Sequence, residues 1–212
     1  MTNARKAREA AQQKAAEMRR IQAARDKRRR LMLIGGAAVL VIAIAGGVFA
    51  LVQNERGKDD AAAADTSLAA VKTYTGLTQN HVQGKVTYKQ TPPVGGDHNP
   101  VWLNCGIYTS PVPNENAVHD LEHGAVWITY RPDLAKADIE KLTDIARGQT
   151  YLDLSPYPGL PAPVVVSAWG KQLYLTGASD PRLPAFIKKY KQGEQTPEPG
   201  AACTGGTGTP NG

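Results

Sequence analysis

AVHDLEHGAVWITY, residues 117–130, is the stretch from which the fold can be worked out. Its first seven residues have helical composition and are followed by Gly124, the residue type that most often ends a helix. The next six residues, 125–130, are apolar, β-branched or aromatic, as in a buried strand. The sequence therefore predicts a two-turn helix over residues 117–123 that leads directly into a strand.

Further elements are predicted on the C-terminal side of this stretch. Residues 133–147 and 180–190 each carry an apolar stripe at helical spacing, which predicts two amphipathic helices. Residues 164–169 and 172–175 are predicted to form a β-hairpin. Four prolines in residues 156–163 predict an irregular connection. Strands interleaved with helices in this way indicate a small α+β domain with a mainly antiparallel sheet.

The first 30 residues hold most of the positive charge of the chain. They contain eleven Lys or Arg and three acidic residues, a formal net charge of +8, whereas the whole chain carries +6. Residues 31–212 therefore sum to −2, and the folded part is close to neutral. Because the excess charge belongs to a tail, the sequence does not favour nucleic acid as a partner.

Residues 31–52, LMLIGGAAVLVIAIAGGVFALV, contain no charged residue and no proline. As a helix they would span about 33 Å, which is enough to cross a bilayer. Arg28, Arg29 and Arg30 directly precede this segment, and the positive-inside rule places the basic tail of residues 1–30 in the cytoplasm. The sequence thus predicts a single-pass protein of the cell membrane whose C-terminal domain is extracytoplasmic.

The rest of the chain divides by composition. Residues 53–70 are polar and alanine-rich, which predicts a flexible linker. Residues 204–212, TGGTGTPNG, contain no hydrophobic anchor and are predicted to be disordered. Between them, residues 71–203 are long enough to form one domain with its own core.

Three of the four histidines and one of the two cysteines fall within residues 91–124. On a two-turn helix His119 and His123 occupy positions i and i+4, so both rings project from one face with Glu122 nearby. Histidines at this spacing are typical ligands of one metal ion. His98, in the preceding glycine-rich loop, is the predicted third histidine ligand.

The predicted cofactor is a transition metal ion, copper before zinc, because imidazole sites bind Cu²⁺ more tightly than Zn²⁺. Glu122 or Asp97 is the candidate for an additional oxygen ligand. The alternative is that the histidines donate to backbone carbonyls and hold two proline-rich loops together. His81 stands apart from the cluster and is predicted to be an ordinary loop residue. No catalytic residue is assigned.

Residues 119–123, HDLEH, also match H-x-x-E-H, the inverted zinc-peptidase motif, in which both histidines bind zinc and the glutamate activates water. Glu194 or Glu198 would then be the third ligand. Such enzymes place the motif inside a long helix, whereas here Gly124 and a strand follow at once. A hydrolase is therefore only a minor alternative.

Cys105 and Cys203 are the only cysteines of the chain. Outside the membrane the two thiols are expected to form a disulfide, which would close a loop of about 100 residues and stabilise the domain by about 4 to 5 kcal/mol. The rival interpretation is that Cys105 is a thiolate ligand beside two histidines, as in copper electron-transfer sites. The two interpretations exclude one another.

Several segments resemble a known family. They are HVQGKVTYKQTPPVGGDHNPVWLNCGIY (residues 81–108), VHDLEHGAVWITYRP (118–132), AWG (168–170) and PEPGAAC (197–203). With them the chain resembles domain-of-unknown-function family 3105 over residues 75–203. The resemblance implies a bacterial, membrane-anchored extracytoplasmic domain, and it implies no activity.

Two functions from different classes follow from these residues. The first is transition-metal binding, in metal handling or in support of a membrane-bound oxidase. The second is a non-enzymatic interaction module, in which proline-rich loops and exposed aromatic residues such as Tyr157 dock on a neighbouring membrane complex.

Overall fold

The computed structural model describes residue 22 and residues 68–211. The predicted transmembrane helix and almost all of the basic tail and linker lie outside these residues. None of the described helices has both the length and the apolar character that crossing a bilayer requires. In chain order the elements are β1 (Lys72–Thr73), α2 (Asn114–Glu122), β2 (Val126–Tyr130), α3 (Lys136–Ala146), β3 (Leu152–Pro156), β4 (Val164–Ala168), β5 (Lys171–Leu175) and α4 (Arg182–Tyr190).

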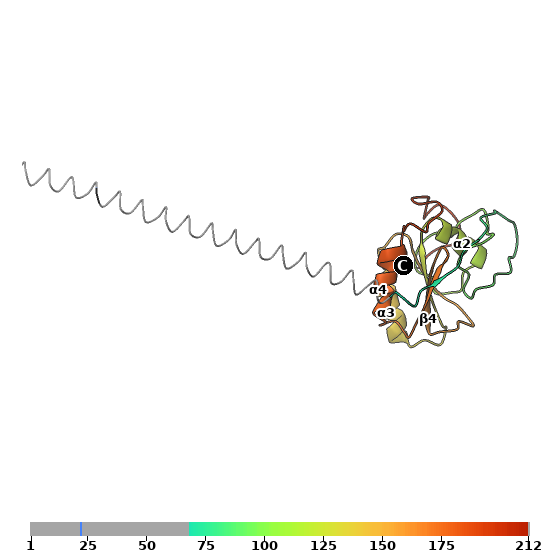
Figure 1. The fold of residues 1–212 in the computed structure, drawn as a ribbon. Helices are drawn as coiled ribbons and strands as arrows, with labels where there is room; N and C mark the ends of the chain where they lie inside the picture. The colour runs from blue at the N-terminus through green and yellow to red at the C-terminus, as the bar shows by residue number, and fades with distance from the viewer. Residues whose placement is uncertain (1–21, 23–67, 212) are drawn as a thin grey trace, which may run out of the picture. The chain divides into compact units, whose positions relative to one another are not determined.

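One five-stranded sheet, in the order β1-β5-β4-β2-β3, forms the centre of the domain (Figure 1). Strands β2 and β3 are parallel, whereas the other three neighbouring pairs are antiparallel. A parallel pair requires a crossover connection, and α3 provides it between β2 and β3. The predicted α+β class is confirmed, and within residues 68–211 it consists of three helices and a sheet that is mixed because of the β2–β3 pair.

Strand β3, like the two-residue strand β1, is an element that the sequence pattern did not predict. Strand β3 pairs with β2 along its whole length, from Val126 opposite Leu152 to Tyr130 opposite Pro156. Pro156 is the last residue of an edge strand, a position where the missing N–H of proline is tolerated. The irregular, proline-rich connection predicted from residue 156 therefore begins only after this strand has ended.

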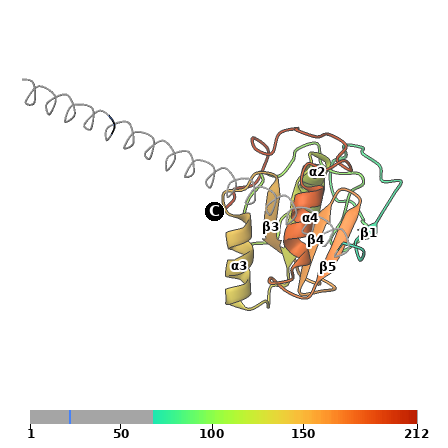
Figure 2. The same cartoon turned by 60° about the vertical axis from the view of Figure 1, so that its left-hand side comes forward.

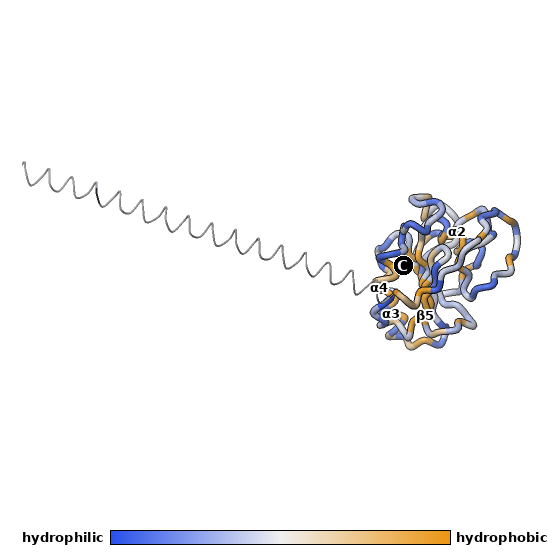
Figure 3. The backbone as a smooth tube through the Cα atoms, viewed as in Figure 1, coloured by the Kyte–Doolittle hydropathy of each residue, from blue (hydrophilic) through white to orange (hydrophobic). Residues whose placement is uncertain are grey.

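Two cores lie on opposite faces of the sheet, because successive side chains of a strand point to opposite sides. Helices α3 and α4 cover the first face (Figure 2), where Phe186 packs on alternate strand residues such as Ile128. Trp127 points to the second face and packs there with α2 and the loops. Figure 3 shows a hydrophobic stretch at β5, whereas the loops around α2 are of mixed hydropathy. The second face also buries polar strand residues: Asp153, Ser155, Ser167 and Gln172.

The domain extends beyond both of its predicted ends. Leu68, in the predicted linker, is 6% exposed and belongs to the first core. Residues 204–211, predicted to be disordered, are held by backbone hydrogen bonds such as those from Asn104 N–H to the Thr207 carbonyl (2.7 Å) and from Thr207 N–H to the Trp102 carbonyl (2.8 Å). The segment contains no hydrophobic anchor, but main-chain pairing does not require one.

Gly124 ends α2 in a backbone conformation that favours glycine, with φ of 94°. A Cβ atom there would overlap Nε2 of Gln192 and approach Cγ2 of Thr196 to 2.9 Å. Gly124→Ala is therefore expected to lower the free energy of unfolding by about 2 to 3 kcal/mol, as measured by urea denaturation.

Gly148→Ala is the matched control for this substitution. Gly148 also has positive φ, 71°, but no described atom lies within 4 Å of the position of its Cβ. Only the backbone cost of about 1 kcal/mol is expected there. Equal losses in the two variants would show that the contact with Gln192 contributes nothing.

Candidate metal centre

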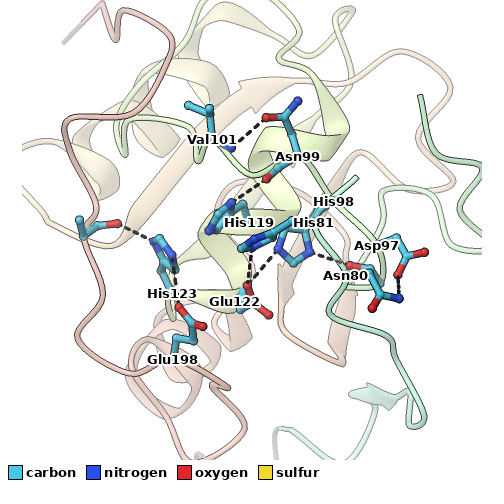
Figure 4. Close-up of polar contacts among 12 residues, drawn as sticks. Asn80, His81, Asp97, His98, Asn99, Val101, His119, Glu122, His123 and Glu198 are labelled. Atoms are coloured by element: carbon cyan, nitrogen blue, oxygen red, sulfur yellow. Dashed lines mark hydrogen bonds and ion pairs between the residues drawn. The ribbon is translucent and has the colours of Figure 1, made fainter. Parts of the chain in front are cut away.

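Four side chains converge between α2 and two loops that precede it. His119 and Glu122 project from α2, while His98 and His81 come from separate loops (Figure 4). Each of the four offers one nitrogen or oxygen atom, and these atoms all lie within 4.8 Å of one another. Such a spacing suits ligands arranged around a single ion.

The two loops are fastened together by their backbones. Val82 N–H donates to the His98 carbonyl at 2.7 Å, and His98 N–H donates to the Asn80 carbonyl at 3.0 Å. This short parallel bridge between residues 81 and 98 places the two rings with their centroids 5.0 Å apart. The ring of His119 lies 4.8 Å from each of them. The positions of all three rings are therefore set by the backbone as well as by the side chains.

Main-chain carbonyls determine which nitrogen faces the centre. Nδ1 of His98 lies 2.7 Å from the Gly96 carbonyl, and Nδ1 of His119 lies 2.7 Å from the Asn99 carbonyl. A carbonyl oxygen only accepts, so both Nδ1 atoms carry hydrogen and donate. In the neutral ring Nε2 is then left with a free lone pair, the usual arrangement of a metal-binding histidine.

His98 and Glu122 face one another in the interior. Nε2 of His98 lies 2.9 Å from Oε2 of Glu122, and their side chains are 0% and 2% exposed. Despite this distance, Nε2 of His98 has no hydrogen bond of good geometry among the described residues. A neutral His98 would direct a lone pair at a carboxylate, which is repulsive. A positive charge is needed between them, either a proton on His98 or a metal ion.

The pKa shifts of His119 and Glu122 favour the protonation states that bind metal ions. Burial lowers the pKa of His119 to about 4, and the neighbouring histidines add to this effect. For Glu122, burial favours the neutral acid, but the neighbouring His98, together with the other histidines, outweighs it and lowers the pKa. At neutral pH His119 is therefore neutral and Glu122 ionised, the forms that bind metals.

His98 is the exception within the group. Burial alone would lower its pKa, but the Glu122 carboxylate and the Gly96 carbonyl prevail and raise it. A metal ion would have to displace this proton. Metal binding is therefore expected to release a proton and to weaken in acid.

His81 completes the group although the sequence pattern did not single it out. Its side chain is 48% exposed, and its Nε2 lies 3.8 Å from Oε2 of Glu122. Its ring stacks on that of His119. The only sequence signal was that all four histidines fall within residues 81–123. The bridge that brings its loop to His98 has no local signature.

His123, predicted as a ligand, lies outside the group of four. Its Nδ1 lies 2.6 Å from the Ala202 carbonyl, and its Nε2 lies 3.7 Å from Oε2 of Glu198. Its ring meets that of His119 edge-on, with centroids 4.4 Å apart. The i, i+4 spacing does make the two rings neighbours, but the C-terminal segment holds His123 away from the common centre.

Asp97 is likewise not part of the group, because its carboxylate accepts a hydrogen bond from Asn80 Nδ2 at 2.9 Å (Figure 4). The zinc-peptidase arrangement would need His119 and His123 on one ion, and Glu194 lies in neither of the metal-type clusters found among the described residues. The geometry thus favours the set His81, His98, His119 and Glu122.

Cys105 and Cys203 form a disulfide, as predicted. An oxidised sulfur is not a thiolate ligand, so the copper-thiolate interpretation of Cys105 does not apply to this state. The bridge instead fastens the C-terminal segment beside α2, where Cys105 N–H donates to the Cys203 carbonyl at 2.8 Å.

Aromatic side chains line the group on two sides. The ring of Trp102 lies 5.9 Å from that of His119, and the ring of Trp169 lies 6.1 Å from that of His98. Tyr157, predicted to be an exposed docking residue, instead packs against Trp127 and accepts a hydrogen bond from Asn114. Within the group of four, His81 is the half-exposed member, so the group is open to solvent on the His81 side.

Comparison with known proteins agrees with the resemblance seen in the sequence. No curated protein and no solved structure matched the chain. A family model described as "Protein of unknown function (DUF3105)" matches residues 81–205, which include all four convergent side chains and both cysteines. Because this match covers more than half of the chain, the protein belongs to the DUF3105 family.

Proposed function

We propose that this protein is a membrane-anchored extracytoplasmic metal-binding protein that holds one divalent transition metal ion through His81, His98, His119 and Glu122. The supporting observation is the buried meeting of His98 Nε2 with the Glu122 carboxylate, 2.9 Å apart, beside two further imidazoles. The anchor is inferred from the apolar segment of residues 31–52.

The donor set indicates the class of metal. Three imidazoles and one carboxylate suit copper, zinc or iron better than Ca²⁺ or Mg²⁺, which prefer oxygen ligands. Within that class Cu²⁺ is expected to bind more tightly than Zn²⁺. We infer a role in metal handling or in support of a membrane-bound oxidase, because the half-exposed His81 would leave one side of the ion open to exchange.

Isothermal titration calorimetry of the full-length chain, purified in detergent and stripped with a chelator, tests the proposal. One Cu²⁺ per chain is expected, with weaker binding of Zn²⁺. His98→Ala is expected to reduce affinity by more than the ~10- to 100-fold that loss of an outer partner of a ligand costs. His81→Ala tests the same site without disturbing the core, because His81 is half-exposed.

His123→Ala is the matched control, since it removes the same type of side chain from the end of the same helix. Its affinity for Cu²⁺ should stay close to that of the unaltered chain. Absence of binding of either ion at micromolar concentration would refute the proposal and favour the interaction-module alternative. A larger effect of His123→Ala than of His81→Ala would instead restore the ligand set expected from the sequence.

A further inference from the structure

A second cluster of reactive groups lies apart from the four convergent side chains. Asp120 comes from α2 and Asp153 is the second residue of β3, and both are 0% exposed. A carboxylate oxygen of each and the Sγ atom of Cys105 all lie within 4.8 Å of one another. Two carboxyl groups thus lie beside a disulfide, in the interior of the domain.

These carboxyl groups have few partners. Gly106 N–H donates to Oδ1 of Asp153 at 3.1 Å. As ionised carboxylates, Oδ2 of Asp153 and both oxygens of Asp120 have no donor of good geometry among the described residues. A proton on one of the two carboxyl groups would form a hydrogen bond to the other, and the Leu103 backbone also interacts with Asp120. Burying an ionised carboxylate under such conditions costs several kcal/mol in order of magnitude, so the protonated form is favoured. An unsatisfied buried group that is kept in a native structure calls for an explanation, and a redox role is one of the established explanations.

Burial raises the pKa of Asp153 to about 7. The titratable side chains that face it are Asp120 and Tyr108, and the pKa of Tyr108 is itself raised, by burial first and then by the two carboxylates. A proton can therefore be released or taken up at Asp153 near neutral pH, next to a sulfur atom.

Reduction of a disulfide releases each sulfur as a thiolate. A thiolate released in the interior of the domain needs a nearby proton, so reduction is the reaction for which a buried acid is useful. A thiolate in apolar surroundings is unfavourable, and a neighbouring acid removes this cost. Cys203 is 8% exposed and its Sγ accepts a hydrogen bond from Tyr151 N–H at 3.2 Å, whereas Cys105 is more exposed. The two cysteines are therefore unequal: Cys105 is the more exposed residue, and Cys203 has a hydrogen-bond donor for its thiolate.

We propose that the Cys105–Cys203 disulfide exchanges with an external dithiol and that Asp153 supplies the proton to the Cys105 sulfur. One thiolate of the dithiol bonds to Sγ of Cys105, the Cys105–Cys203 bond breaks, and the Cys203 thiolate leaves beside Tyr151 N–H and takes a proton from solvent. The second thiolate of the dithiol then displaces Cys105, whose sulfur takes the proton of Asp153. The dithiol loses two electrons and becomes a disulfide, the protein gains two thiols, and solvent reprotonates Asp153. No metal ion takes part, so this activity is independent of the metal-binding proposal.

The rate of reduction by dithiothreitol in the full-length, chelator-treated chain tests this proposal. New thiols are counted by alkylation and mass spectrometry between pH 5.5 and 8.5, and each rate is divided by the concentration of dithiothreitol thiolate. The normalised rate should fall as pH rises past 7. At pH 6 the normalised rate of reduction of Asp153→Asn should be lower than that of the unaltered chain by about tenfold or more. The normalised rate of this variant should not fall as pH rises past 7.

Asp144→Asn is the control, because Asp144 is an exposed carboxylate on α3, paired with Arg147. Its reduction rate should equal that of the unaltered chain. Near-UV circular dichroism establishes whether Asp153→Asn is folded, and the pH profile of the unaltered chain tests the proposal without any variant. Reduction that occurs only after unfolding in urea, or a normalised rate independent of pH, would overturn the proposal.

Discussion

Replacing both cysteines, Cys105→Ser together with Cys203→Ser, is expected to lower the free energy of unfolding by about 3 to 5 kcal/mol. The bridge joins residues 98 positions apart, so it restricts the unfolded chain over most of the domain. It also supports the C-terminal segment, whose Ala202 carbonyl anchors His123. Urea denaturation of the full-length variant and of the unaltered chain measures the difference.

The double substitution avoids a single free thiol, and serine can still accept the hydrogen bond from Tyr151 N–H that Cys203 accepts. The control is the unaltered chain after full reduction and alkylation, which should lose a similar free energy. A loss below about 1 kcal/mol would mean that the reduced chain keeps the same restriction by other contacts. A large loss also means that folding favours the oxidised form, so the external dithiol that reduces this bridge must itself be strongly reducing.

Asp153→Asn is expected to make the domain more stable than the unaltered chain at pH 8 and not at pH 4. In the folded state burial raises the pKa of Asp153 from about 3.8 to about 7. A raised carboxyl pKa contributes stability that is present below pH 4 and is lost as pH rises through 7, with a slope of about 1.4 kcal/mol per pH unit. Asparagine stays neutral and can still accept the hydrogen bond from Gly106 N–H.

The quantity to measure at each pH is the difference in free energy of unfolding between Asp153→Asn and the unaltered chain. A difference is needed because other groups also titrate. The pKa of His119 is lowered to about 4, so His119 contributes stability that is lost as pH falls from 6.5 to 4, the opposite direction. Subtracting the variant from the unaltered chain cancels the contribution of His119. The remaining difference reports Asp153 together with its interaction with Asp120, whose pKa is raised by burial first and then by Asp153. The measurement is made by urea denaturation with a chelator present, so that no ion occupies the histidines. A difference that does not change with pH would show that Asp153 is ionised in the folded protein.

Local patterns accounted for most of the elements. The helix, glycine and strand of residues 117–130, the hairpin of β4 and β5, and the helices α3 and α4 were each predicted from short-range periodicity and turn residues. Strand β3 was missed because its proline lies at its end and because parallel pairing through a crossover has no local signal. The segment of residues 204–211 was missed because it is held by main-chain hydrogen bonds, which are invisible in composition.

The candidate metal centre divides in the same way. His119 and Glu122 were predicted to lie together because residues three positions apart on a helix are neighbours on its surface. His81 and His98 were assigned different roles from sequence, yet a backbone bridge brings them to one point. The i, i+4 spacing made His123 a stronger candidate ligand than His81. In the structure, however, the ring of His123 contacts the Ala202 carbonyl, 79 residues further along the chain.

The sequence by itself determined the helices and most strands, the α+β class and the family. These features depend on periodicity and motifs within short stretches of the chain. The structure decided between a disulfide and a thiolate ligand for Cys105. Only the tertiary structure decided which histidines share a centre and that two carboxyl groups lie beside the disulfide. Both arrangements join residues from distant parts of the chain, and the packing of loops and strands against α2, which no local pattern records, brings them together.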